Sequence, residues 1–247
     1  MLFSSAELAQ YISQLFEPAW ESVRDVPIVT IDFGKGNVIK RTLHGNIATY
    51  VCTADGGVLD VMPGIYTPDV YRQRLEQFRL LHLYANSLKA KRGAPPRNAA
   101  QSEPAEAMAA CLADYHRRQA TALRQNRAAE VLAFVPDGGK LVIEMPVKLV
   151  AATSIPTVKP TVSAKPATKA EELATWQALA DDTRHNETVR RLQIHEKLAE
   201  TGPVRPEALV KWLYKDVLHA DLDDPYLGLR DILFKDYPFA AEDKPTQ

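Results

Sequence analysis

The chain has 247 residues, 46% of them hydrophobic, which suffices for one or two packed domains. Its 30 Lys and Arg residues nearly balance 31 Asp and Glu residues, for a net charge of −1. This balance gives no reason to expect a nucleic-acid partner or an anionic membrane surface. We expect no membrane span, because no apolar run approaches the ~18 residues that one needs, and the N-terminus lacks a signal-peptide pattern. Two cysteines are too few for a disulfide framework, so the compartment stays open.

The N-terminal part predicts one helix followed by β-structure. Residues 4–22 carry apolar side chains at helical spacing, and Ser4 and Glu7 fit a capping box. Residues 26–33 are rich in β-branched residues and end at a glycine-rich turn, which predicts a strand. For residues 38–43 the sequence leaves a second short strand and a turn of helix open.

Residues 44–84 contain the clearest pattern, a predicted β-hairpin that leads into a helix. Two apolar runs, residues 47–52 and 58–62, flank Asp55-Gly56-Gly57, where glycine readily adopts the positive φ that a tight turn needs. The first run is apolar without alternation, which is typical of a strand covered on both faces. Pro63 cannot donate to a ladder, so the pairing should stop there.

The helix that follows this hairpin should begin at Thr67 and Pro68, which are residue types of an N-cap and a first helical position. Arg74 is one of several charged residues expected mostly off the apolar face of this helix. That face should contain, at helical spacing, Tyr71, Leu75, Phe78 and His82.

The order strand, Asp-Gly turn, strand, Pro63-Gly64 and helix resembles the C-terminal half of a thioredoxin-like domain, over residues 5 to 85. The resemblance is to bacterial members with helical extensions. It implies an α/β fold in which an abridged mixed sheet is flanked by helices, with His44 and Asn46 at the substrate-facing edge. The chain lacks the proline that this family places just before the first of these strands, and it contains no Cys-x-x-Cys redox motif.

The middle of the chain predicts a loop, a helix and a second hairpin. Residues 89–106 are rich in Pro and charge and indicate a linker, and residues 104–130 are Ala-rich and helical by propensity. Residues 131–150 repeat the hairpin pattern around Asp137-Gly138. Because a lone hairpin is marginal in water, this one should extend the first sheet or pack on a helix, docking on the first domain.

The C-terminal part predicts a Pro-rich linker and an all-α segment. Residues 151–170 carry Pro, Thr and Lys with no acidic residue, which is typical of an extended linker. Helices are predicted at residues 171–179, 187–200, 206–219 and 226–234. The predicted domains are therefore a thioredoxin-like domain at 1–90, a helix and hairpin extension at 91–150, the linker at 151–170 and the helical segment at 171–247.

Two cysteines are the first candidates for chemistry. Cys52 lies in a predicted central strand, where it is either a redox or metal thiol or, as we favour, a small buried hydrophobe. Cys111 lies in the Ala-rich helix, and whether it pairs with Cys52 is left open. The basic cluster near His116 could meet phosphate or an acidic partner, but a solvated helix face is favoured; it contains Arg117, Arg118, Arg124 and Arg127.

The remaining histidines and acids favour structural roles. His185 and His195 are ten residues apart and cannot share one ion on a straight helix. The segment between Asp182 and Glu187 is interpreted as a capping turn, with Asp182 or Asn186 as the cap. The acids from Asp221 to Asp224 lack the spacing of a calcium loop and favour a helix end followed by a helix cap.

The sequence therefore predicts a non-catalytic protein-binding or scaffold module, or a subunit of a larger assembly, with a protein partner. The alternative is a thiol-dependent redox protein that uses Cys52. A third hypothesis is ligand or metal binding through His44 or the C-terminal acids. No phosphate-binding loop, nucleophile elbow or paired-cysteine zinc spacing occurs, so no cofactor is predicted.

Overall fold

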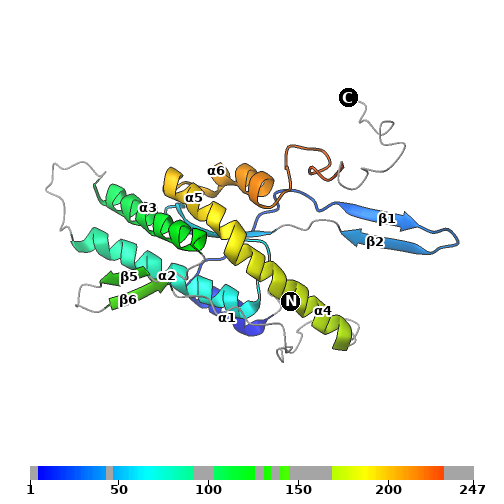
Figure 1. The fold of residues 1–247 in the computed structure, drawn as a ribbon, viewed down its shortest axis with the longest axis horizontal. Helices are drawn as coiled ribbons and strands as arrows, with labels where there is room; N and C mark the ends of the chain where they lie inside the picture. The colour runs from blue at the N-terminus through cyan, green and yellow to red at the C-terminus, as the bar shows by residue number, and fades with distance from the viewer. Residues whose placement is uncertain are drawn as a thin grey trace. The chain divides into compact units, whose positions relative to one another are not determined.

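The computed structural model describes residues 5–42, 47–91, 103–125, 131–134, 140–144 and 169–230, as helices and three two-stranded antiparallel sheets (Figure 1). The expected mixture of helices and strands is confirmed. The chain divides into two units, of which unit 1 comprises residues 1–19 and 47–206 and unit 2 comprises residues 20–46 and 207–247. Within the described parts of the chain, no helix has both the length and the apolar character needed to cross a membrane.

Both units are discontinuous in sequence, which differs from the predicted consecutive domains. Residues 20–46 leave the expected N-terminal domain for unit 2, and the helical segment after the linker is divided near residue 206. Changes in composition mark linkers along a chain, but they do not show which distant segments pack together. Most of the predicted linker, residues 151–168, lies outside the described residues.

The predicted central hairpin is present in unit 1. Strands β3 (Ala48–Cys52) and β4 (Val58–Pro63) pair antiparallel, with Ala48 opposite Pro63 at the end of the ladder. The connection is a loop closed by a bond from Thr53 N to Gly57 O at 2.8 Å, rather than a two-residue turn. Of the two strands, β4 is buried along its whole length and β3 only at Val51, so full burial was predicted for the wrong strand.

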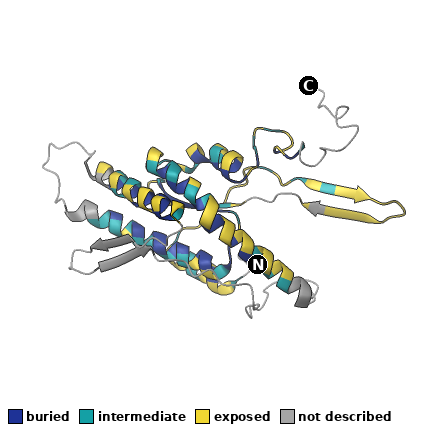
Figure 2. Ribbon diagram, in the orientation of Figure 1, coloured by how far each residue is buried: buried dark blue, intermediate teal, exposed yellow. Residues whose placement is uncertain are grey.

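Helix α2 (Pro68–Lys91) begins where predicted, and the Thr67 carbonyl accepts from Tyr71 N at 3.0 Å. It lies beside α3 (Glu103–Arg124), and Figure 2 shows that both helices bury one face. Helix α1 (Ala6–Leu15) is shorter than predicted, and Ser5 rather than Ser4 caps it. The shared apolar core consists of Leu8, Val51, Leu59, Met62, Tyr66, Val70, Tyr71, Leu75, Phe78, Leu81, Ala85, Met108, Leu112 and Tyr115.

One long helical run replaces the two helices and the capping turn predicted after the linker. It consists of α4 (Lys169–His185), a single π-helical turn η2 (Asn186–Arg190) and α5 (Arg191–Thr201). The capping prediction for Asp182 and Asn186 is wrong because the backbone stays helical through both residues. Polar residues in this helical run form hydrogen bonds to other elements instead of capping a helix.

This helical run docks on the loop between β4 and α2. The Asn186 amide donates to Ile65 O at 2.8 Å, and Thr67 N donates to the Thr183 hydroxyl at 2.8 Å. Gly64 has φ +76°, and a Cβ there would lie 3.0 Å from the Asn186 amide nitrogen. Glycine is therefore required at this close approach.

The second hairpin, β5 (Val131–Phe134) and β6 (Lys140–Glu144), forms a sheet of its own. Strand β6 lies against α2, which confirms that the hairpin packs on a helix of the first unit. Among the described residues β3 and β4 pair only with each other. The predicted mixed sheet is wrong for the described strands, which form three separate antiparallel pairs, and the thioredoxin-like resemblance itself stays a prediction.

Unit 2 contains the third sheet, β1 (Ile28–Asp32) paired with β2 (Val38–Thr42), so the strand alternative for residues 38–43 is right. Helix α6 (Pro206–Trp212) and the π-helical turn η3 (Leu213–Val217) correspond to the third predicted C-terminal helix.

The fourth predicted C-terminal helix, from Tyr226 onward, is wrong as far as Leu229, because this stretch forms turns. The Asp224 carboxylate accepts from Tyr226 N at 2.6 Å, which is an Asx turn rather than a helix cap. The Arg24 guanidinium donates to the Asp224 and Pro225 carbonyls at 2.5 Å each, so it fixes this loop from the N-terminal part of the same unit.

Candidate functional site

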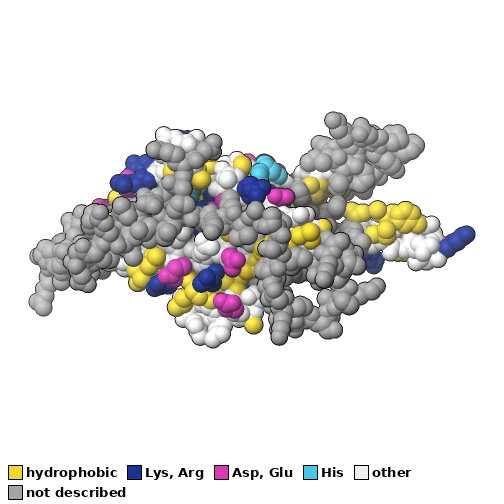
Figure 3. All heavy atoms as spheres, turned by 60° about the horizontal axis from the view of Figure 1, so that its bottom comes forward, with side chains coloured by type: hydrophobic (Ala, Val, Ile, Leu, Met, Phe, Trp, Pro, Cys, Tyr) yellow, Lys and Arg dark blue, Asp and Glu magenta, His cyan; other side chains and the backbone are white. Residues whose placement is uncertain are grey.

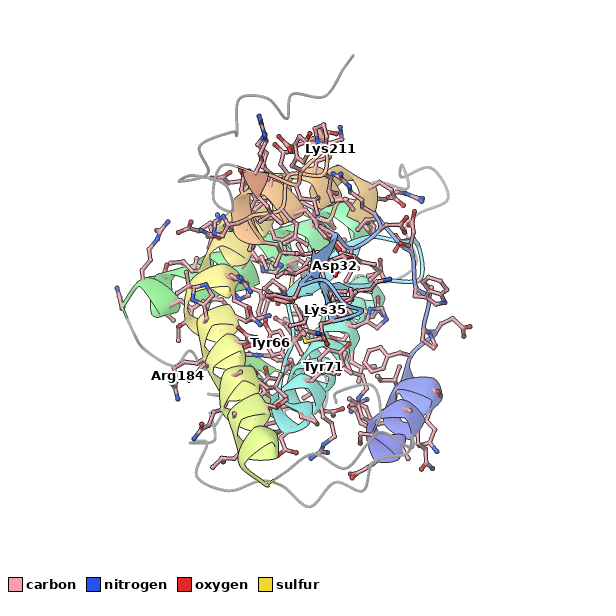
Figure 4. The ribbon with its side chains drawn as sticks, turned by 90° about the vertical axis from the view of Figure 1, so that its right-hand side faces the viewer. Asp32, Lys35, Tyr66, Tyr71, Arg184 and Lys211 are labelled. Atoms are coloured by element: carbon pink, nitrogen blue, oxygen red, sulfur yellow. The ribbon has the colours of Figure 1, made fainter. Side chains whose placement is uncertain are left out.

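A cluster of ionisable side chains lies in the interior of unit 1, where β4, α2, α3, η2 and α5 meet. In Figure 4, Tyr66 lies between α2 and the α4–α5 helical run, whereas Arg184 points away from it. All members of the cluster are buried, and we call them the buried polar network: Asp60, Arg74, His116, Glu187, Arg191 and His195.

Three members of the buried polar network come from one helix face. Glu187, Arg191 and His195 are four residues apart, a spacing that brings side chains onto the same side of a helix. The π-helical turn contains Glu187 and ends immediately before Arg191. π-Helical turns are often found at functional sites. Here the turn occurs where Glu187, Arg191 and His195 are buried together.

The contact with the most hydrogen bonds in the network joins α2 to η2. Arg74 Nε donates to Glu187 Oε1 at 3.2 Å and to Oε2 at 3.0 Å, and Arg74 Nη2 donates to Oε2 as well. Arg74 Nη1 donates to Gln77 Oε1 at 2.6 Å. A guanidinium that is hydrogen-bonded to a carboxylate through two nitrogens is fixed in both position and orientation. The expectation that Arg74 lies mostly off the buried face of α2 is therefore wrong.

The second ion pair joins α5 to β4. Arg191 Nη2 lies 3.1 Å from Asp60 Oδ2, and the Arg191 guanidinium lies over the Phe78 ring at 5.5 Å. Asp60 Oδ1 accepts from Val61 N at 2.8 Å, and Tyr115 Oη approaches Oδ2 at 3.5 Å. Two cations and two carboxylates thus neutralise one another inside the unit.

The two imidazoles form a hydrogen-bonded chain whose direction is fixed by its ends. Arg191 Nη2 lies 3.1 Å from His195 Nε2, and a guanidinium only donates, so this nitrogen accepts. His195 therefore carries its proton on Nδ1 and donates to His116 Nδ1 at 2.9 Å. His116 then carries its proton on Nε2 and donates to Leu59 O at 3.0 Å. Both rings are neutral in this arrangement.

The pKa values of the buried groups follow from this geometry. Burial raises the pKa of Asp60, and Arg191 offsets only part of this effect. Burial would also raise the pKa of Glu187, but Arg74 and Arg191 outweigh it, so that pKa is lowered. Burial, with Arg191 and His116 nearby, lowers the pKa of His195 well below its usual value.

Asp60, His116 and His195 also satisfy the first requirement of a metal site, because one ligand atom from each lies within 4.8 Å of the others. The Arg191 guanidinium contacts two of them, Asp60 Oδ2 and His195 Nε2, at 3.1 Å each. A divalent ion would have to displace this cation from a buried and neutral cluster. Arg191 thus takes the place that a metal ion would need, and these residues do not fit a metal in this arrangement.

The network is better suited to hold elements together than to perform chemistry. Each imidazole nitrogen faces another member or a backbone carbonyl, so neither ring can accept a further proton without losing a hydrogen bond. Both carboxylates are engaged by guanidinium groups. The groups that acid–base catalysis would need are therefore committed to one another.

The buried polar network contains none of the residues predicted to form the site. His44 and Asn46 lie outside the described residues. Cys52 is exposed at the end of β3, so its predicted burial is wrong, whereas Cys111 is half-buried; the two do not form a disulfide. Burial and then Asp114 raise the pKa of Cys111.

The other candidates have structural roles or face solvent. His185 is exposed, and His116 turns inward, away from the exposed Arg117 and Arg118 of the predicted basic cluster. Asp221 and Asp223 pair with the nearby side chains of Lys215 and Lys211 at 2.6 and 2.8 Å. The carboxylates of these acids are thus engaged by lysine side chains and by the turn.

Two signals in the sequence could have indicated the network. Asp60 is a single charge inside the apolar run Val58 to Met62, and a lone charge in a buried strand requires a buried partner. Glu187, Arg191 and His195 recur at intervals of four on a helix that also carries buried apolar residues. Their partners on α2 and α3 are distant in sequence and could not be paired by spacing.

No protein-family model, curated protein or solved structure matches the chain. The functional argument therefore starts from the described residues alone.

We expect Glu187→Gln to lower the free energy of unfolding by about 3–5 kcal/mol, because Arg74 would keep its charge in the interior without a carboxylate partner. The matched control is Glu196→Gln, which removes the exposed ion pair to Arg124 and should cost less than about 1 kcal/mol. Urea unfolding of both variants measures the difference. Equal small losses would contradict a structural role for the buried pair.

The lowered pKa of His195 predicts that stability falls in acid. Below the ordinary histidine pKa of about 6.5 the unfolded chain binds a proton that the folded chain excludes, so the stabilisation is complete above that pH and declines as the pH falls. One such proton contributes at most about 1.4 kcal/mol per pH unit.

This pH dependence should be seen in thermal or urea unfolding between neutral and mildly acidic pH. His195→Asn should flatten the slope, whereas His185→Asn, which changes an exposed histidine, should keep it. An unchanged slope in His195→Asn would show that His195 is not the titrating group.

Proposed function

We propose that the chain is a non-catalytic protein-binding module, of the scaffold or subunit kind, with a thioredoxin-like arrangement around β3, β4 and α2. The observation that supports it best is an exposed apolar surface on the β1–β2 hairpin of unit 2. Figure 3 shows apolar side chains along this hairpin, and Ile31, Phe33 and Ile39 are 47, 66 and 41% exposed.

The register of the hairpin explains why these side chains form one surface. Ile31 lies opposite Ile39, and Val29 lies opposite Arg41. Opposite residues in an antiparallel pair share a face, and side chains alternate along each strand. One side of the hairpin is therefore mainly apolar, and we call it the apolar hairpin face: Val29, Ile31, Phe33 and Ile39.

A hairpin of this kind needs a covering partner. Two strands alone are marginally stable in water, and apolar side chains grouped on one face add a cost of exposure. The same unit also exposes Trp20, at 90%. Large exposed apolar and aromatic side chains that gather in one unit are typical of surfaces that another protein covers.

The buried polar network supports the non-catalytic part of the proposal. Its carboxylates and imidazoles are bonded to one another inside unit 1, as derived above. What the β1–β2 hairpin of unit 2 adds at its surface is apolar side chains, which suit binding.

The test compares two neighbouring substitutions on β2 in the tagged full-length chain, isolated under mild conditions from its source cells. Ile39→Glu places a charge on the apolar hairpin face, and Lys40→Glu places the same charge on the opposite face. Proteins retained by the unchanged chain should be retained by Lys40→Glu and lost from Ile39→Glu in quantitative mass spectrometry. Identical retention by both variants would refute binding through this face.

A second candidate function, thiol-dependent redox chemistry, is favoured by one observation, the exposure of Cys52. If Cys52 is a reactive thiol, native protein should be alkylated at this position far faster than at the half-buried Cys111. As the pH is raised, the alkylation rate of such a thiol should reach its plateau before the pH arrives at the ordinary thiol pKa of about 8.5.

Mass spectrometry after timed alkylation over a range of pH distinguishes reactivity from mere access. Cys52→Ser is the control that removes the signal. A rate that keeps rising through pH 8.5, as for a simple exposed thiol, would leave protein binding as the only function supported.

A further inference from the structure

We infer that the outer edge of β1 pairs with β1 of a second copy of this chain, so that two hairpins join into one four-stranded sheet. This inference deepens the proposed function and rests on it, because it names one partner of the same hairpin. It uses the free edge of the hairpin, whereas the proposed function uses the apolar hairpin face.

Among the described strands β1 pairs with β2 alone, so one edge of its backbone has no strand partner there. Phe33 N donates to Asn37 O at 2.9 Å, which places Phe33 in a bonded pair across the hairpin. Bonded and non-bonded pairs alternate in an antiparallel ladder, so Ile31 and Val29 also face β2 with their backbone groups. The backbone groups of Ile28, Thr30 and Asp32 therefore point away from β2, to the open edge.

Charge distinguishes the two edges of the hairpin. The β2 edge carries Lys40, and lysine on an edge strand is a common protection against unwanted pairing. Along β1, residues 28–31 (Ile-Val-Thr-Ile) carry no charge and have high β propensity, and the one charged residue, Asp32, is the last residue of the strand. Of the two edges, only the β2 edge carries a charge at its centre, because Thr30 holds that position on β1.

The β1 edge is also complementary to itself. A two-fold axis at Thr30 would pair Thr30 with the Thr30 of the second copy, Val29 with Ile31 and Ile28 with Asp32, so that no like charges meet. Paired threonines and paired aliphatic residues are favourable across strands. The same operation on β2 would place Lys40 opposite Lys40, which is unfavourable.

A two-fold arrangement closes after two copies, whereas β1 pairing with β2 of another copy would continue into a chain of molecules. The closed pair keeps both apolar hairpin faces on one side of the joined sheet, since the axis is perpendicular to it. The result is a dimer with an enlarged apolar surface for the protein partner.

The direct test measures the molar mass of the full chain by light scattering after gel filtration. Thr30→Pro removes the outward N–H of β1 without removing a bond to β2, and Lys40→Pro does the same on the β2 edge. We expect the unchanged chain and Lys40→Pro to be dimers and Thr30→Pro to be a monomer. A monomeric unchanged chain, a dimeric Thr30→Pro, or monomers from both variants would overturn the inference.

A second variant separates edge pairing from misfolding. Thr30→Lys keeps the N–H but places like charges across the axis, so it should be monomeric at low salt and should regain dimers at high salt, where the repulsion is screened. A misfolded hairpin would not recover with salt, and a lack of recovery would count against the two-fold register. A monomeric chain that still loses its partners through Ile39→Glu would sink this inference alone and leave the proposed function standing.

Discussion

The ion pair between Arg74 and Glu187 is the contact on which the arrangement of unit 1 depends. Moving two charges out of water costs several kcal/mol for each ion, and this cost is offset only when the geometry is good. The guanidinium and the carboxylate meet through several hydrogen bonds, and both are buried. A small shift of η2 along α2 would leave two unpaired charges in the interior, so the register of these two helices is fixed more sharply than apolar packing alone would fix it.

The rest of the buried polar network extends this constraint to the other elements. Arg191, one helical turn after Glu187, contacts Asp60 on β4. His195, one turn further along, is hydrogen-bonded to His116 on α3. The network therefore joins five elements, β4, α2, α3, η2 and α5, and its members are bonded to one another. The surface that we propose for binding lies instead in unit 2, where the hairpin exposes apolar side chains.

The sequence predicted the parts of the fold that local chemistry determines. Asp55-Gly56 marked the first hairpin and Thr67-Pro68 marked the start of α2, because turns and helix starts depend on residues close in sequence. Arg74 and Asn186 were misjudged because a charged or amide side chain on a helix is usually solvated or a cap. Here their partners, Glu187 and Ile65 O, come from segments more than a hundred residues away.

The most direct measurement is a double-mutant cycle on the central ion pair, with Arg74→Leu, Glu187→Leu and the double variant compared by urea unfolding. Each single change leaves a buried charge without its partner, whereas the double change leaves none. We predict that the double variant loses less free energy of unfolding than the sum of the two single losses, by more than about 2 kcal/mol. Losses that add to within about 0.5 kcal/mol would show that Arg74 and Glu187 do not act as a pair, and would contradict the account.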